Sequence, residues 1–306
     1  MIIDSTIPQY DSEPTSLISL HVSCRNLFKT DVFSPSDPLV KVYAKHADTW
    51  KLLGETEHIE NDPNPDFVKY FEMEYYFEKQ QDLKVVVHDV DQVGSRRELS
   101  MIGQAFVKLG QVMGGANLTH ICDITLPGKV ESRGKLVLRA DSIQGTNDEI
   151  LLDISATSLK SCKTLFGAVG KDDPFFYMSR GREENKTEFV RVYQSKSLHK
   201  TLNPQYPTVS IWERNLTQGD VERTLKLEFF SWRNNGYHKP YGFCEFKLSD
   251  VLEGFSEYEL TLGTKQVSNI WISAWRIVKP SFVDFLKEWE LNLMCATDFT
   301  QSNGDV

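Results

Sequence analysis

Four aspartates in the first half of the chain stand where their carboxylates would share a cation. Asp31 and Asp37 flank a short stretch rich in Ser, and Asp89 and Asp91 close an apolar alternating run. Two carboxylates at one strand end repel each other unless a cation lies between them. Ca²⁺ suits such a site because it accepts many oxygen ligands in a tolerant geometry, whereas Zn²⁺ would need clustered His or Cys. A solvated turn with Asx hydrogen bonds is the alternative for either pair alone.

The runs that must position these aspartates have the period of a β-strand. Apolar and polar residues alternate in residues 18–22, 83–87, 152–154 and 225–229. Such short runs, separated by Pro, Asn and Gly, are typical of antiparallel strands with one buried face. Helical periodicity is scarce before residue 280. We therefore expect an all-β fold of the sandwich type.

The sequence repeats itself once. Asp37-Pro38, Asn64-Pro65, residues 83–87 and Gly103 each have a counterpart about 140 residues later, at Asp173-Pro174, Asn203-Pro204, residues 225–229 and Gly242. Four matches in the same order at nearly one offset predict two tandem copies of one β domain. The boundary is expected around residues 142–148, a polar stretch.

Length and composition exclude several classes of protein. The 306 residues suggest two domains, and the formal net charge of −9 argues against general nucleic-acid binding, which needs a basic face. No apolar run approaches the roughly 20 residues that span a bilayer, and residues 1–6 have no signal-peptide pattern. The five scattered cysteines form no CxxC pair and fit free thiols in a reducing compartment. We therefore expect a cytoplasmic protein.

Several motifs resemble those of a known domain family, the C2 domains. They are Leu27-Phe28-Lys29-Thr30-Asp31, Ser36-Asp37-Pro38, Asn64-Pro65-Asp66-Phe67, Val87-His88-Asp89-Val90-Asp91 and Ile102-Gly103. The stretch 64–69 and the ending Asp298-Phe299-Thr300-Gln301-Ser302-Asn303-Gly304-Asp305 resemble the copines, which carry two C2 domains and then a von Willebrand A-type domain. The resemblance covers nearly the whole chain except residues 1–16.

The resemblance implies three parts. Residues 1–141 are expected to be a calcium-binding C2 domain (the first copy), residues 146–280 a second C2 domain (the second copy), and residues 281–306 the incomplete α/β beginning of an A-type domain. The motif Asp298-x-Thr300-x-Ser302 resembles the adhesion motif that holds Mg²⁺ in A-type domains. The other ligands of that motif lie further along such domains, so we expect a truncated chain or a fragment with no working metal site here.

The resemblance also implies which residues bind calcium in the first copy. C2 domains bind Ca²⁺ through Asp residues in two loops at one end of the sandwich, and the matching positions here are Asp31, Asp37, Asp89 and Asp91. The fifth position of the family holds Ser100. Glu98 lies two residues earlier, which puts it out of register with the family pattern.

The second copy departs from this pattern. Asp173 is kept, but Ser231-Trp232-Arg233 replaces the Asp-x-Asp pair, and Lys239 replaces a further ligand. Basic side chains at these positions would repel a divalent cation, so we expect this copy to be calcium-independent. Its aromatic and basic residues between 232 and 241 would dock on lipid headgroups, since Trp and Tyr favour the interface, or form an exposed loop with no partner.

The implied function is calcium-dependent binding of phospholipid. Bound Ca²⁺ cancels the negative charge of the first copy's loops, so that they dock reversibly on an anionic membrane while Phe33 and Val93 insert. We expect recruitment to the plasma membrane or other membranes when calcium rises. No G-x-S-x-G, P-loop or H-E-x-x-H motif is present, so no enzyme activity is expected. The alternative is a calcium-independent scaffold that binds protein partners.

Overall fold

The computed structural model describes residues 15–29, 36–93, 96–143, 146–162, 164–165, 168–169, 172–182, 187–252 and 254–279. Within these ranges, residues 91–93, 96–97, 164–165 and 168–169 are described by their backbone alone. Among the predicted residues, Asp31, Phe33 and the whole of 281–306 lie outside the described part of the chain. No helix in the described part is long and apolar enough to cross a membrane.

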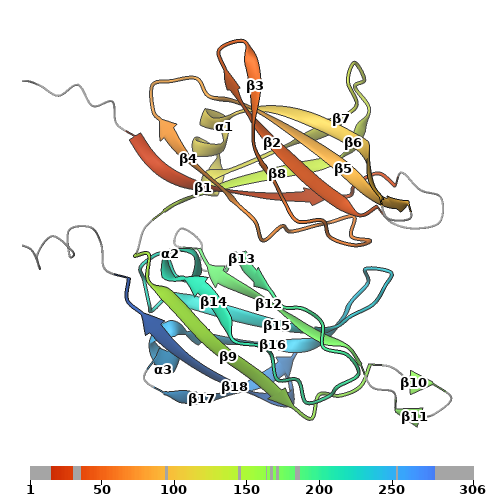
Figure 1. The fold of residues 1–306 in the computed structure, drawn as a ribbon, viewed down its shortest axis with the longest axis vertical. Coiled ribbons are helices and arrows are strands. Elements are labelled where there is room, and N and C mark those ends of the chain that lie inside the picture. The colour runs from red at the N-terminus through yellow and green to blue at the C-terminus, as the bar shows by residue number, and fades with distance from the viewer. Residues whose placement is uncertain are drawn as a thin grey trace, which may run out of the picture.

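The first copy is an eight-stranded antiparallel structure with the strand order β3-β2-β5-β6-β7-β8-β1-β4 (Figure 1). Its strands are β1 (Thr15–Arg25), β2 (Pro38–His46), β3 (Thr49–Glu55), β4 (Phe71–Tyr76), β5 (Asp82–Val93), β6 (Arg96–Lys108), β7 (Thr119–Thr125) and β8 (Ser132–Ser142). Two short helices, α1 (Leu109–Met113) and η1 (Ala116–Leu118), lie between β6 and β7. Because β6 and β7 share only one residue pair, Gln104 with Thr125, the sheet folds into two layers.

The second copy repeats this order as β13-β12-β15-β16-β17-β18-β9-β14. Its strands are β9 (Glu149–Thr157), β12 (Pro174–Gly181), β13 (Phe189–Gln194), β14 (Val209–Trp212), β15 (Thr224–Ser231), β16 (Lys239–Lys247), β17 (Phe255–Leu262) and β18 (Lys265–Ile277). Short helices α2 (Glu213–Leu216) and α3 (Leu248–Leu252) accompany them, and β10 (Thr164–Leu165) pairs with β11 (Ala168–Val169) in a separate hairpin. The prediction of an all-β fold is confirmed.

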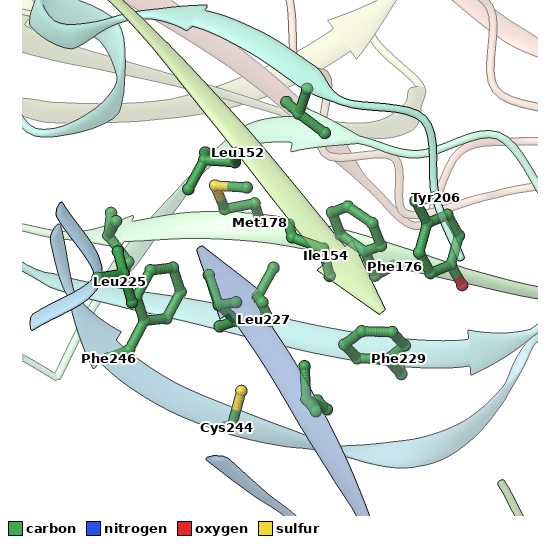
Figure 2. Close-up of a cluster of buried hydrophobic side chains, with 14 of the residues drawn as sticks. Leu152, Ile154, Phe176, Met178, Tyr206, Leu225, Leu227, Phe229, Cys244 and Phe246 are labelled. Atoms are coloured by element: carbon green, nitrogen blue, oxygen red, sulfur yellow. The ribbon is translucent and has the colours of Figure 1, made fainter. Parts of the chain in front are cut away.

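Each copy has its own apolar core, built from the inward positions of both layers. In the first copy Leu20 and Leu138 from one layer share a buried cluster with Val42 and Val85 from the other. Figure 2 shows the cluster of the second copy, where Phe176, Tyr206 and Phe229 pack ring against ring. The Phe176 ring lies 4.7 Å from that of Tyr206 and 5.4 Å from that of Phe229. The alternation of apolar and polar residues along the strands therefore produces two sandwiches, each with its own core.

The two copies pack against each other, with the first above the second in Figure 1. All eight residues of β12 are buried, although an antiparallel strand of a sandwich commonly has one solvated face. The first copy covers part of β12, with Asp141 against Arg180, and rings of the second copy cover another part, with Trp232 and His238 against Phe175. Contacts between the copies join Arg191 to the Asp66 carbonyl, Arg214 to Glu72, Arg139 to Glu188, and Tyr70 to Asn215.

A buried ion cluster lies in the middle of this interface. Asp141 at the end of β8 is 6% exposed, and its carboxylate lies 2.8 Å from Arg180 and 3.3 Å from Arg182 of the second copy. Both arginines are 3% exposed. His21 of β1 faces the same carboxylate, with Nε2 at 3.6 Å from Oδ2. Two permanent cations therefore neutralise one buried anion across the interface.

Candidate metal centre

Asp37 is the first predicted ligand that the structure describes, and it begins a tight connection at one end of the first copy. Its backbone N–H donates to Oδ1 of Asp89 at 2.7 Å, and its carbonyl accepts from the Val90 N–H at 3.0 Å. Its own Oδ1 accepts from the backbone N–H of Asn61 at 2.6 Å. Three segments of chain therefore meet at Asp37. We call this end of the first copy, which comprises Asp37, Asn61 and Asp89, the first tip.

Asp89 is held at the same tip by β5. It is paired with Pro38 in the β2–β5 ladder and is only 2% exposed. One carboxylate oxygen is used by the Asp37 N–H. The structure thus brings Asp37 and Asp89 together, as the sequence predicts, although the two residues lie in different segments of the chain.

The β5–β6 register places the remaining candidates of this hairpin. A bulge between Val87 and His88 shifts the ladder, so that Ser100 lies opposite Asp89 and Glu98 lies opposite Asp91. Spacing along the sequence alone put Glu98 out of register, because it cannot reveal a bulge. Asp91 and Val93 are both in β5, and only their backbone is described.

The charges at the first tip oppose one another. Burial raises the pKa of Asp37 above its ordinary value, the Asn61 N–H acts in the opposite direction, and the negative charges of Asp89 and Glu60 raise the pKa further. The negative charges of Asp89 and Glu60 thus destabilise the ionised form of Asp37. A cation placed between them would remove this repulsion.

The donor set fits a hard divalent cation. Asp37 and Asp89 offer carboxylate oxygens, and neither Cys nor His takes part in the bonds just described. Among the residues whose side chains the structure describes, no group of three or more His, Cys, Asp or Glu is arranged to hold a metal. A complete site therefore needs the two further predicted ligands, Asp31 and Asp91, whose side chains are outside the described set.

The corresponding end of the second copy, which we call the second tip, is built around Asp173, Lys200 and Ser231. Asp173 Oδ1 accepts from the Lys200 N–H at 2.8 Å, as Asp37 does from Asn61. The Asp173 carbonyl accepts from the Trp232 N–H at 2.9 Å, as that of Asp37 does from Val90. Asn61 and Lys200 both have a positive φ, of 53° and 48°. The two tips therefore share one backbone frame.

The side chains that fill this frame in the second copy are different. Ser231, fully buried, stands where Asp89 stands in the first copy. The Arg233 guanidinium, at the position matched to Asp91, donates to the carbonyl of Cys162 at 3.0 Å. The second tip therefore contains a cation of its own. Arg233 connects the end of β15 to the loop after β9, which carries Cys162.

Asp172 is a residue of the second tip that the sequence analysis missed. It is fully buried, and its Oδ2 accepts from the Cys162 N–H at 2.5 Å and from the Tyr241 hydroxyl at 2.8 Å. Burial, and then the bond to Asp172, raise the pKa of Tyr241. The signal was present as the doubled Asp172-Asp173 before Pro174, where the first copy has Ser36-Asp37.

The aromatic and basic loop of the second tip is more tightly packed than expected. Trp232 stacks on His238, with ring centroids 4.4 Å apart, and both rings contact Phe175. Burial lowers the pKa of His238 to about 4, and Arg191 contributes to the shift. Tyr241 is 4% exposed, whereas Tyr237 is 62% exposed. Within the loop, Tyr237 and Lys239 are thus better placed to meet a partner than Trp232 or Tyr241.

Comparison with known proteins identifies the domain type and the relatives. A family model described as C2 domain matches residues 16–124 and 154–263. Copine-B and Copine-A of Dictyostelium discoideum are similar over nearly the whole chain, with 32% identity over 305 residues and 29% over 303 residues. These matches cover 94% and 95% of this chain but 56% and 49% of the relatives. The chain therefore spans about half the length of the curated relatives it matches.

Solved structures with similar folds are more distant. The calcium-bound tandem C2 domains of Extended-Synaptotagmin 2 have 16% identity and a TM-score of 0.32, covering 87% of this chain and 98% of that one. BON1-C2B has 22% identity and a TM-score of 0.36, covering 44% of this chain and 94% of that one. Likeness at this level carries no argument about ligands. By the family match and the sequence relatives, the chain belongs to the C2 domain family, with two copies in tandem, and its homologues over almost its whole length are copines.

Proposed function

We propose that the first copy binds calcium and that this binding docks the chain reversibly on anionic phospholipid membranes. The observation that carries the proposal is the meeting of Asp37 and Asp89 at the first tip, where burial and the charge of Asp89 raise the pKa of Asp37. A tip that carries several carboxylates repels an anionic surface. Calcium, when bound, supplies the positive charge that reverses this repulsion and offers sites for lipid phosphate oxygens.

The proposed ligands are Asp31, Asp37, Asp89 and Asp91. Glu98 is a further candidate because it lies opposite Asp91, and directly opposite positions in an antiparallel pair carry neighbouring side chains. Ser100, opposite Asp89, offers a hydroxyl where the family has a carboxylate. With one carboxylate fewer, we expect weaker affinity than a full set of five would provide.

Docking would add a small apolar contribution to the electrostatic one. Phe33 and Val93 are the proposed inserting residues, and burial of such a side chain contributes about 1.5–3 kcal/mol. This is a modest anchor, in keeping with peripheral and reversible recruitment from the cytoplasm when calcium rises. The proposed activity is binding and not catalysis.

The second copy is proposed to work without calcium. Arg233 occupies the second tip with a permanent positive charge, and Ser231 removes the carboxylate that corresponds to Asp89. We divide the chain into residues 1–141 for the calcium-binding copy, 146–280 for the calcium-independent copy and 281–306 for the beginning of an A-type domain.

The test is co-sedimentation of the full chain with vesicles. Vesicles of neutral lipid and vesicles with increasing anionic lipid are each mixed with the protein in calcium or in EGTA. We expect the protein in the pellet only when calcium and anionic lipid are both present. Equal sedimentation in calcium and EGTA would contradict the proposal and favour the calcium-independent scaffold.

A further inference from the structure

The two tips touch each other through Asn61. In Figure 1 the outer end of the β5–β6 hairpin and the β10–β11 hairpin extend to the same side of the molecule. The Asn61 side-chain amide donates to the Asn234 carbonyl of the second tip at 2.8 Å. The backbone N–H of the same residue donates to Asp37 Oδ1 at 2.6 Å. One residue therefore connects a proposed calcium ligand of the first copy to the loop of the second.

The loop of the second copy also approaches the backbone of Asn61 closely. Gly236 has a φ of +74°, and a Cβ built on it would lie 2.0 Å from the Asn61 carbonyl oxygen. Only glycine fits in this position, because the clash would be with backbone and not with a mobile side chain. The loop from 234 to 236 thus packs directly on the backbone of Asn61.

A cavity lies beside this contact between Asn61 and the 234–236 loop. The segment 57–60 that leads to Asn61 lines a cavity of about 970 Å³ between the copies, with Tyr177, Tyr193 and Trp232 on the opposite wall. The position of Asn61 is therefore set at its two ends, by Asp37 on one side and by the 234–236 loop on the other. Lys200, the counterpart of Asn61 in the second copy, has an exposed side chain.

From this chain of contacts we infer that the second copy regulates the calcium affinity of the first. The inference rests on the proposed function, since it concerns the same site. The left-handed conformation belongs to the frame that both tips share, but only at Asn61 does a loop of the other copy pack on this backbone; the 234–236 loop thereby limits the movement of the N–H that donates to Asp37, and so steadies the carboxylate before the ion arrives. Because binding free energies are reciprocal, calcium at the first tip must in turn tighten the loop of the second copy.

The test uses the full chain with two variants that break the contact from opposite sides. Gly236→Ala places a methyl group against Asn61, and Asn61→Gly removes the amide while keeping the backbone conformation accessible. The matched control is Gly263→Ala, because Gly263 also has a positive φ, of +62°, but a Cβ there meets nothing within 4 Å. Calcium affinity is measured by titration calorimetry, and amide hydrogen exchange of residues 234–238 is measured with and without calcium.

We expect Gly236→Ala and Asn61→Gly each to weaken calcium binding by about fivefold or more, within the usual range of coupling between sites. Gly263→Ala should keep the wild-type Kd, and calcium should slow exchange at 234–238 in the wild type but not in Asn61→Gly. A wild-type Kd in both contact variants, or an equal loss in Gly263→Ala, would overturn the inference and leave the proposed function intact. Absence of calcium binding in the wild type would instead overturn the proposed function, and the inference with it. If Gly236→Ala fails to fold, Asn61→Gly decides alone.

Discussion

The first and second tips share one backbone frame but neutralise charge in different ways. In the first tip two carboxylates, those of Asp37 and Asp89, lie close together, and the charge of Asp89 raises the pKa of Asp37. In the second tip Ser231 replaces one carboxylate, and Arg233 brings a positive charge to the loop that carries Cys162. Because the hydrogen-bonded frame around Asp37 and Asp173 is the same, the proposed difference in calcium dependence rests on two side-chain positions at the strand end.

At the interface between the copies, as at the second tip, the positive charge comes from arginine side chains of the protein. Asp141 is buried, and two arginines of the chain lie against it. A charge that must be neutral at all times is paired with a permanent cation from the protein. On the proposed function, the carboxylates of the first tip are instead neutralised by an ion from solution. Each of the following predictions tests one side of this difference.

The largest expected effect is at the interface, where Asp141→Ala leaves the buried Arg180 without its anion, while Arg182 keeps its contact with Glu188. Removing one partner of a buried pair commonly costs about 3–5 kcal/mol. Urea unfolding should show a loss of that size. The control is Asp123→Ala, which removes an exposed partner of Lys135 and should change stability too little to resolve. Similar losses in both variants would show that the interface cluster does not differ from a surface pair.

The next effect concerns the external cation. At free calcium about a hundredfold above Kd, ligand binding should stabilise the wild-type first copy by about 2.7 kcal/mol. Asp89→Asn with Asp91→Asn should lose this gain and also lose calcium-dependent sedimentation with vesicles. Asp173→Asn, the matched change at the second tip, should keep both responses. A calcium response that survives in the first variant would remove Asp89 and Asp91 from the site.

The permanent cation of the second tip gives a smaller effect. Arg233→Ala loses a charged hydrogen bond to the Cys162 carbonyl, which we expect to cost about 1.5 kcal/mol. Hydrogen exchange of the second-copy amides should report this loss, and millimolar calcium should not restore it. For the same reason residues 146–280 alone should show no calcium-dependent rise in melting temperature. Restoration by calcium would mean that the second tip still holds an ion site.

The fold was predictable from the sequence because its signal is local and repeated. Residues 83–87 and 225–229 alternate in the same way and form β5 and β15, which have the same place in two identical strand orders. The repeat extends to single hydrogen bonds. The Asn64 side chain accepts from the Asn26 N–H at 2.8 Å, and the Asn203 side chain accepts from the Ser158 N–H at 2.8 Å.

The joining of the copies was not predictable in this way. Arg180 and Asp141 are charged residues in alternating strands, which in one sequence look like solvent-facing positions. They are buried only because a second sandwich covers the face, and strand periodicity within each copy carries no information about that packing. That Glu98 lies opposite Asp91 was not predictable for a related reason, since the bulge at Val87 is a property of the pairing of two strands. The pairing of Asp37 with Asp89 was anticipated because family motifs encode contacts between strands that spacing does not.

The smallest predicted effect is a pH dependence at the interface. Burial lowers the pKa of His21 well below 6.5, and the charges of Arg180, Arg139 and Arg182 lower it further. The unfolded chain then binds a proton at His21 more readily than the folded chain, so stability falls as pH drops through about 6.5, by about 1.4 kcal/mol between pH 7.5 and 5.5. Urea unfolding between pH 7.5 and about 5.5 should show this loss, and His21→Gln should reduce the pH slope by the share of His21, leaving that of His238. His238, whose pKa is also lowered but which is only half-buried, serves as the comparison for His21. An unchanged pH slope in His21→Gln would show that the arginine-rich interface does not exclude a third positive charge.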